Sequence, residues 1–341
     1  MASANKLRVI SIKHDSSNDK NMKNSDNIKS KLLKAQILNK DRIIILYDNN
    51  TIIESKISSN SEDISYTYKI NNSYNKIDKK YASKINNKII KFCNFGSVLI
   101  QAGFYDGRFE VIYFNDKTEK KRNEYYPFNE NEPIISMNIN EDETILVLGN
   151  TIGNIAVYKI DIENDIFSLS KKIFHQMSPI SDININNDLN LFASSSIDGF
   201  INLYTLPLCK LVRSIKVVLD KEKYEKCSYV FVSESSLPSI IVISQNIEES
   251  QIYSYSINGQ FLTNSKEDKN LLSPLKIKDL NSYEYLVYYN SSEIYIRNLP
   301  SLSIQIIVQN VVNIRSICIN EDITAIYGIN EDGTQISAIR D

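Results

Sequence analysis

Hydrophobic and polar positions follow one recurring pattern along most of this chain. An alternating apolar run is followed by an Asx-rich turn, a second apolar run, a Gly-containing turn and a third run that ends in an aromatic or aliphatic residue. Alternation at period two is typical of half-buried β-strands. Helical periodicity is weak throughout. The pattern therefore predicts an all-β protein whose strands are joined by tight turns.

Copies of this pattern recur along the chain. Residues 135–142 align without gaps on residues 181–188, at an offset of 46 residues (188 minus 142), and Gly153 then falls on Gly199. A third copy starts at residue 317. A period in the forties with several strands per unit is typical of the blades of a propeller, because each unit is too small to bury its apolar face alone.

Seven clusters of strands are marked out by their third strands. These third strands are predicted at residues 51–57, 108–114, 154–159, 200–205, 251–257, 293–298 and 335–339. Their spacing suits blades of four strands with outer loops of variable length. Residues 7–12 also alternate, and we expect this strand to complete the last blade and close the ring. The sequence thus predicts a seven-bladed β-propeller.

Polar segments suggest how the chain is divided. Residues 1–31 are expected to hold the N-terminal strand and a polar loop that cannot bury enough surface to order itself. Residues 32–341 are expected to form the propeller. Polar stretches near 60–88 and 115–131 are interpreted as insertions. The second insertion mixes cations with tyrosines, as nucleic-acid or acidic-peptide sites do, but acidic residues dilute it and favour a solvated loop.

Composition narrows the classes of function. The 341 residues hold 39 Lys and Arg against 41 Asp and Glu, so the net charge does not favour binding to nucleic acid. No apolar run approaches the ~18 residues of a membrane span, and the N-terminus has no signal-peptide core. The cysteines are far apart and are expected to be reduced thiols: Cys93, Cys209, Cys227 and Cys318. These features predict a cytoplasmic protein.

Glycine-containing turns combine carboxylates with a flexible backbone, which invites a catalytic or metal-binding interpretation. The structural interpretation is favoured, since Asp-Gly between two alternating runs is the signal of a tight hairpin. The predicted blade turns contain Asp106, Gly107, Gly153, Asp198, Gly199, Asp332 and Gly333. No residue is assigned to catalysis, to a cofactor or to a metal.

Residues 191–204 resemble the second and third strands of a WD-repeat blade, with Tyr204 where the family usually has Trp. In that family a His, a turn Asp, a hydroxyl residue and the Trp form a hydrogen-bonded set. The resemblance implies that the remnants of this set are His175, Asp198, Ser194 or Ser196, and Tyr204. The chain contains no Trp and departs from the family there. A hydrolase triad built on His175 is disfavoured, because no serine lies in a nucleophile-elbow pattern.

A narrower similarity concerns residues 97–109, 202–213 and 253–260. They resemble the C-terminal propeller of BEACH-domain proteins of the neurobeachin-like family, and the Leu206-Pro207 step recurs at Leu299-Pro300. The likeness covers about residues 32 to 341. In that family the propeller follows a BEACH domain and a pleckstrin-homology-like module, neither of which occurs in these residues. The resemblance implies the propeller portion of a larger scaffold in vesicle trafficking or autophagy.

The sequence therefore favours a non-catalytic scaffold that binds other proteins or peptides on its loop faces. We expect a monomeric propeller that needs no cofactor and associates with membranes only through its parent protein. Two alternatives stay open. One is a propeller hydrolase that uses carboxylates at the mouth of the channel, and the other is a WD-repeat subunit of another complex, such as a ubiquitin-ligase receptor. The sequence identifies no partner-binding residue.

Overall fold

The computed structural model describes residues 8–12, 32–39, 42–47, 51–56, 66–69, 89–93, 96–104, 106–115, 118–219, 225–246, 248–268, 271–279, 281–290, 293–308, 314–319, 325–330 and 335–339. Side chains are described mainly between residues 89 and 308. Regular structure in these ranges consists of β-strands, and no α-helix occurs among them. The predicted all-β class is confirmed.

The described strands form seven four-stranded antiparallel sheets, which we call blades. The first three consist of β2 (Leu32–Asn39), β3 (Arg42–Tyr47), β4 (Thr51–Lys56) and β5 (Tyr66–Lys69); β6 (Ile89–Cys93), β7 (Val98–Ala102), β8 (Phe109–Asn115) and β9 (Thr118–Tyr125); and β10 (Ile134–Ile139), β11 (Ile145–Asn150), β12 (Ile155–Asp161) and β13 (Ile166–Ile173). The next three consist of β14 (Ile180–Asn186), β15 (Leu191–Ser196), β16 (Phe200–Thr205) and β17 (Leu211–Lys216); β18 (Lys226–Ser233), β19 (Ser239–Gln245), β20 (Ser250–Ser256) and β21 (Phe261–Glu267); and β22 (Leu272–Lys278), β23 (Glu284–Tyr289), β24 (Ile294–Asn298) and β25 (Ile304–Val308). The last blade joins β26 (Ile314–Ile319), β27 (Ala325–Asn330) and β28 (Gln335–Ile339) to β1 (Arg8–Ile12).

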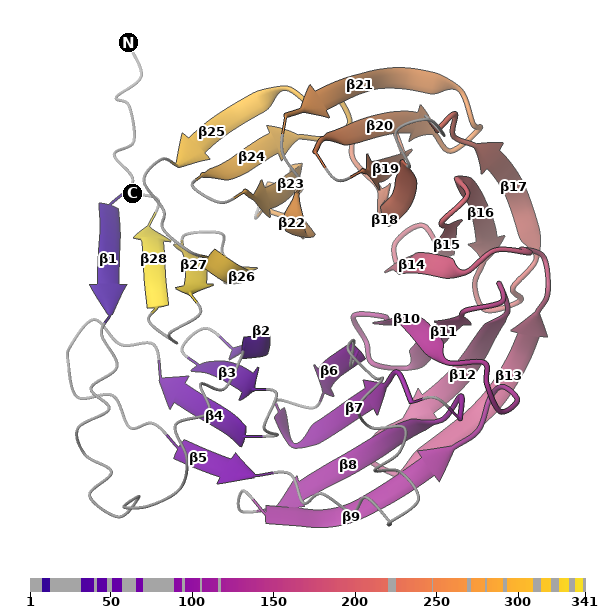
Figure 1. The fold of residues 1–341 in the computed structure, drawn as a ribbon, viewed down its shortest axis with the longest axis vertical. Coiled ribbons are helices and arrows are strands. Elements are labelled where there is room, and N and C mark those ends of the chain that lie inside the picture. Colours follow the sequence, from indigo (N-terminus) through magenta and orange to yellow (C-terminus); the bar gives the residue numbers. More distant parts are fainter. Residues whose placement is uncertain are drawn as a thin grey trace.

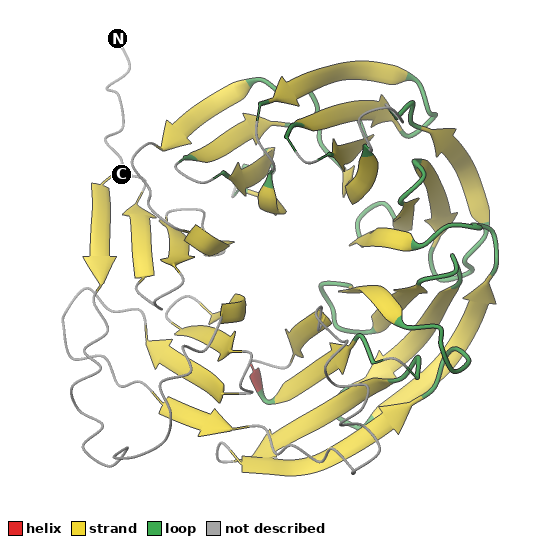
Figure 2. Ribbon diagram, in the orientation of Figure 1, coloured by secondary structure: helices red, strands yellow, loops and turns green. Residues whose placement is uncertain are grey.

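The blades lie around a common centre, each with its first strand innermost and its fourth strand outermost (Figure 1). Where the loops within a blade are described, as between β14, β15, β16 and β17, they are short (Figure 2). This arrangement is β-propeller-like. Every third strand expected from the sequence overlaps the third strand of a blade, namely β4, β8, β12, β16, β20, β24 and β28.

The first strand of the chain pairs with the last. Strand β1 lies antiparallel to β28, in a register that runs from Arg8 opposite Ile339 to Ile12 opposite Gln335. This is the pairing expected for the strand at residues 7–12. It places segments from opposite ends of the sequence in one sheet.

The hydrophobic core lies between neighbouring blades. Ala193, Ile201 and Leu203 of one blade pack in a single cluster with Val230 and Val242 of the next, and all five are buried. Burying an aliphatic side chain of this size contributes about 1.5 to 3 kcal/mol. Neighbouring blades thus cover one another's apolar faces. The apolar positions that recur in the sequence are therefore the ones that form the core.

Asn side chains of the repeat link the innermost strands of adjacent blades. Asn138 on β10 donates from Nδ2 to the carbonyl oxygen of Ile183 on β14, at 2.9 Å. The equivalent residue 46 positions later, Asn184, accepts from the backbone N–H of Val232 on β18 through Oδ1, also at 2.9 Å. The Asn positions of the repeat therefore satisfy backbone groups on the next blade.

One predicted insertion is wrong. Residues 115–131 were expected to form a polar loop, but Thr118–Tyr125 form strand β9, the outermost strand of its blade. An outermost strand has one side in solvent, so charges there do not oppose strand formation. Arg122 also ion-pairs with Glu119 and with the buried Glu110. Within the other predicted insertion, 60–88, strand β5 is present and the remaining positions lie outside the described residues.

Candidate interaction site

Each blade presents loops at two ends. Because its four strands alternate in direction, the hairpin between the first and second strands lies at one end, which we call the hairpin face. The turn between the second and third strands lies at the other end, together with the link to the next blade. We call this end the turn face. It carries the predicted glycine turns.

The turn glycines are required by both backbone conformation and space. Gly153 and Gly199 have φ of +95° and +90°, values that L side chains rarely adopt. A Cβ on Gly153 would lie 2.4 Å from the carbonyl oxygen of Gln176, and one on Gly199 would lie 2.9 Å from that of Val217. Each turn thus packs directly on the link to the next blade. Gly107 repeats this arrangement, with φ of +76°, whereas Asp332-Gly333 lies outside the described residues.

The carboxylates of these turns have partners inside the turn. Asp198 accepts a hydrogen bond of 2.6 Å from the hydroxyl of Ser196. Burial opposes ionisation of Asp198, but the Ser196 hydroxyl and the nearby Lys216 outweigh it and lower the pKa of this carboxyl. Asp106 forms an ion pair with Arg108 and accepts from its backbone N–H at 3.3 Å. Both residues stabilise the turn that contains them.

Tyr204 is the centre of the implied hydrogen-bonded set. Its ring stacks on Phe192, with centroids 4.8 Å apart, and on His175, with centroids 5.8 Å apart. Asn202 donates from Nδ2 to the Tyr204 hydroxyl at 3.2 Å. Burial raises the pKa of Tyr204 to about 12, although bonds from Asn202 and Ser194 oppose the shift. A buried tyrosine therefore occupies the position where the resembled family has Trp.

The structure divides the implied set into two groups. Ser194 and His175 lie beside Tyr204, whereas Asp198 bonds to Ser196 instead of His175. The reason is that Gln176, which was not identified from the sequence, lies on the link between β13 and β14. Its side-chain amide takes the position beside Ser194. It accepts from Ser194 Oγ at 2.8 Å and donates to the carbonyl oxygen of Phe200 at 3.0 Å. An amide performs both roles without a proton transfer.

Apolar side chains are exposed on the turn face. Met177 is 99% exposed, Val218 84% and Phe174 66%, and Ile152 and Phe200 are also exposed. We call these five residues the apolar strip. Phe174, Met177 and Val218 belong to links between blades, Ile152 belongs to a glycine turn, and Phe200 begins strand β16 directly after Gly199. Large exposed apolar residues gathered at one place are typical of interaction sites.

Contacts join the segments that carry the strip. The turn with Ile152 touches the link with Met177 through Gly153 and Gln176. Gln176 bonds to the carbonyl oxygen of Phe200, whose neighbour Gly199 packs against the link holding Val218. The ammonium of Lys216 lies 3.9 Å from the centre of the Phe200 ring. The apolar strip therefore belongs to two consecutive blades and to the links that follow them, and these segments are in contact.

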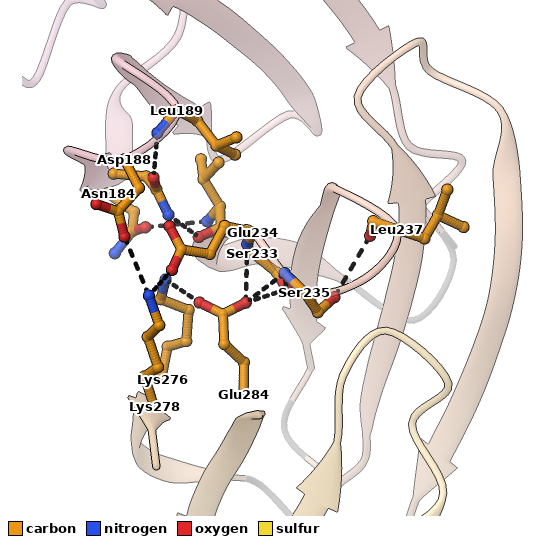
Figure 3. Close-up of polar contacts among 12 residues, drawn as sticks. Asn184, Asp188, Leu189, Ser233, Glu234, Ser235, Leu237, Lys276, Lys278 and Glu284 are labelled. Carbon is orange, nitrogen blue, oxygen red and sulfur yellow. Dashed lines mark hydrogen bonds and ion pairs between the residues drawn. The ribbon is translucent and has the colours of Figure 1, made fainter. Parts of the chain in front are cut away.

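The opposite, hairpin face carries a cluster of charged groups centred on Glu284 (Figure 3). The side chain of Glu284 is fully buried, and its Oε1 accepts from Lys276 Nζ at 2.7 Å. Its Oε2 accepts from the backbone N–H groups of Glu234 and Ser235, at 2.8 and 3.0 Å, and from the hydroxyl of Ser233. Glu284 lies on β23 and Lys276 on β22, so the carboxylate links the β18–β19 loop to the first two strands of the next blade.

Lys278 joins the hairpins of three blades at the edge of this cluster. It ion-pairs with Glu234 and, at 3.1 Å, with Asp188, which lies on the β14–β15 hairpin. Burial and the bond with Asp188 raise the pKa of Glu234, while that same bond and Lys278 lower the pKa of Asp188. Two carboxylates in contact favour a shared proton. The charged groups of the cluster thus neutralise one another.

Three thiols, Cys93, Cys209 and Cys227, are free and buried. Burial raises the pKa of Cys227 to about 12. Cys318 lies in a strand whose side chains are not described. Among the described residues no three His, Cys, Asp or Glu side chains are grouped as metal ligands would be. No helix there has the length and hydrophobicity of a membrane span.

Comparison with known proteins finds no family model that matches this chain. No curated protein matches it either.

Proposed function

We propose that this chain is a non-catalytic scaffold for protein–protein interaction. In this proposal the blades form a closed, seven-bladed, WD-repeat-like propeller whose ring is completed by the N-terminal strand. The pairing of β1 with β28 and the position of Tyr204 support it.

The apolar strip is the observation that carries the proposal. Exposed apolar surface lowers the solubility of a protein. If a partner binds over these residues, they are removed from water, and this gives a reason for their exposure in the free chain. Met and aromatic side chains are enriched in protein interfaces, and the strip includes Met177, Phe174 and Phe200.

Rigidity of the strip also supports binding. Its turns are fixed by glycines that touch the neighbouring links, and the link with Phe174 and Met177 is held by Gln176. A surface that is already ordered loses less conformational entropy on association than a flexible one. The strip is therefore organised before any partner arrives.

The parent protein is proposed to be of BEACH type and to act in vesicle or membrane trafficking or in autophagy. The sequence segments 97–109 and 202–213, which resemble the propeller of that family, support this part of the proposal. The scaffold would then be cytoplasmic and peripheral to membranes through its parent. A BEACH-coding region in the same reading frame directly upstream is expected; an upstream stop codon contradicts the assignment.

Affinity capture from cell extract tests the scaffold function. The intact chain, a variant with Phe174→Ser and Met177→Ser, and a control with Leu211→Ser and Val212→Ser are compared. The control changes residues that are also exposed but lie on outer strand β17. We expect defined proteins to be retained by the intact chain and the control and lost by the strip variant. Equal retention by all three, or by none, refutes the proposed surface.

A further inference from the structure

Strand β25 forms the outer edge of its blade. The strand order is β22-β23-β24-β25, so β25 pairs with β24 on one side, and no described strand pairs with its other side. An edge strand presents unpaired N–H and C=O groups, which are a template for another extended chain.

The edge of β25 carries no charge. Its sequence is Ile304-Gln305-Ile306-Ile307-Val308, and the uncharged stretch that contains it extends from Asn298 to Ile314. Proteins usually protect edge strands with Lys or other charged side chains, which oppose pairing with a second chain. Each other outer strand of the described blades has a cation, namely Lys69, Lys121, Lys171, Arg213, Lys266 or Arg8.

The side chains of β25 also suit a further strand. Ile304 is 48% exposed and Ile307 40%, and Gln305 between them is exposed. Ile306 packs against the cluster of Tyr289 and Ile296, which fixes the face that the strand turns inward. Ile and Val have high strand propensity, so β25 is an ordered, apolar and unprotected edge.

We propose that β25 pairs with β25 of a second copy of this chain. Antiparallel pairing centred on Ile306 sets Ile304 opposite Val308 and Gln305 opposite Ile307. No charged side chain then faces another across the two strands. The two copies use the same residues, as a two-fold symmetric dimer requires. The same pairing of β9 would bring clusters of Lys and Arg together. The two blades merge into one continuous eight-stranded sheet.

This dimer goes beyond the proposed function and differs from the monomer that the sequence predicts. It uses the outer edge of the ring, so the turn face with the apolar strip remains exposed in both copies. A single strand pair buries little area, and we therefore expect association to be weak and concentration-dependent.

Sedimentation velocity of the intact chain up to about 1 mM tests the dimer, because even a weak complex is populated there. We expect the sedimentation coefficient to rise with concentration. Ile307→Lys should abolish the rise, whereas Val212→Lys, at an exposed position of charged outer strand β17, should leave it unchanged. Circular dichroism and the Tm of both variants verify folding.

Hydrogen exchange locates the interface. Amides of residues 304–308 should exchange at least several-fold more slowly at high than at low protein concentration, and those of β17 should not change. A monomer throughout the range overturns the proposal. So does a dimer that survives Ile307→Lys with its fold intact, since that dimer would use another surface. These outcomes are independent of partner capture by the apolar strip.

Discussion

Lys276 Nζ lies 2.7 Å from Oε1 of Glu284, whose side chain is fully buried. The two residues lie on neighbouring strands, β22 and β23. The other oxygen of Glu284 holds the β18–β19 loop of the adjacent blade. One ion pair therefore stabilises both a hairpin and a junction between blades, and its loss should affect stability more than an exposed pair does.

Lys276→Met should lower the free energy of unfolding by about 3 kcal/mol, because it leaves the buried Glu284 carboxylate without its cation. Lys266→Met is the matched control. It removes an ion pair with Glu249 from a lysine that is 53% exposed, and such pairs contribute about 0 to 1 kcal/mol. Urea denaturation measures both. Equal costs for the two variants contradict the role assigned to Glu284.

Gly153→Ala and Gly199→Ala should each destabilise the protein by about 2 kcal/mol or more, since positive φ and a close carbonyl oxygen both oppose a Cβ. Gly259→Ala separates the two causes. Gly259 has φ of +83°, but the nearest atom to its added Cβ is a side-chain carbon of Ile215 at 3.4 Å. We expect a cost nearer 1 kcal/mol there. Thermal denaturation that ranks Gly259→Ala as the worst of the three refutes this explanation.

Glu234→Gln should change how stability depends on pH. Burial and Asp188 raise the pKa of Glu234 above about 4.3, the value in an unfolded chain. The stability contributed by protonated Glu234 is therefore complete below that value and is lost as pH rises through the folded pKa. Gln resembles the protonated acid and does not titrate. The variant should gain stability relative to the parent as pH rises, in urea titrations from pH 4 to 8.

Asp188→Asn should change the pH dependence of stability in the direction opposite to Glu234→Gln. The bond from Glu234 and the cation of Lys278 lower the pKa of Asp188 below about 3.9. Its contribution is present above that value and is lost as pH falls through the folded pKa. The Asn variant should therefore lose stability relative to the parent as pH rises from the folded pKa to about 3.9, in urea titrations extended below pH 4. Parallel curves for the parent and both variants show that the two carboxylates are not coupled.

Tyr204→Phe should cost about 1 to 2 kcal/mol, because it leaves the buried amide of Asn202 without an acceptor. His175→Ala should cost less, about 1 kcal/mol or below, since it removes only a stacked ring from an exposed position. Guanidinium denaturation gives both values. The reverse order means that stacking outweighs the hydrogen bonds around Tyr204.

The blades could be predicted because their signals are local. The third strands alternate, and Gly153 and Gly199 recur at the same place in successive copies. Strand β9 was missed because its charged side chains hide the alternation of an outer strand. Nothing in the pattern distinguishes such a strand from a solvated loop.

The charged cluster could not be predicted from the sequence. Asp188, Glu234 and Lys278 lie on three separate blades, and 90 residues separate Asp188 from Lys278. They come together only because the hairpins of neighbouring blades lie side by side in the folded protein. Gln176 was missed for a related reason, since its partners are the hydroxyl and carbonyl of another blade. Interactions between blades depend on packing that a repeat pattern does not encode.

Synthesis imposes an order on the last blade. Arg8 pairs with Ile339, so strand β1 is synthesised well before the strand with which it pairs. At about 5 to 20 residues per second the delay is roughly 20 to 60 seconds. During that time β1 lacks its partner strand β28. The last blade can therefore be completed only after β28 has been made.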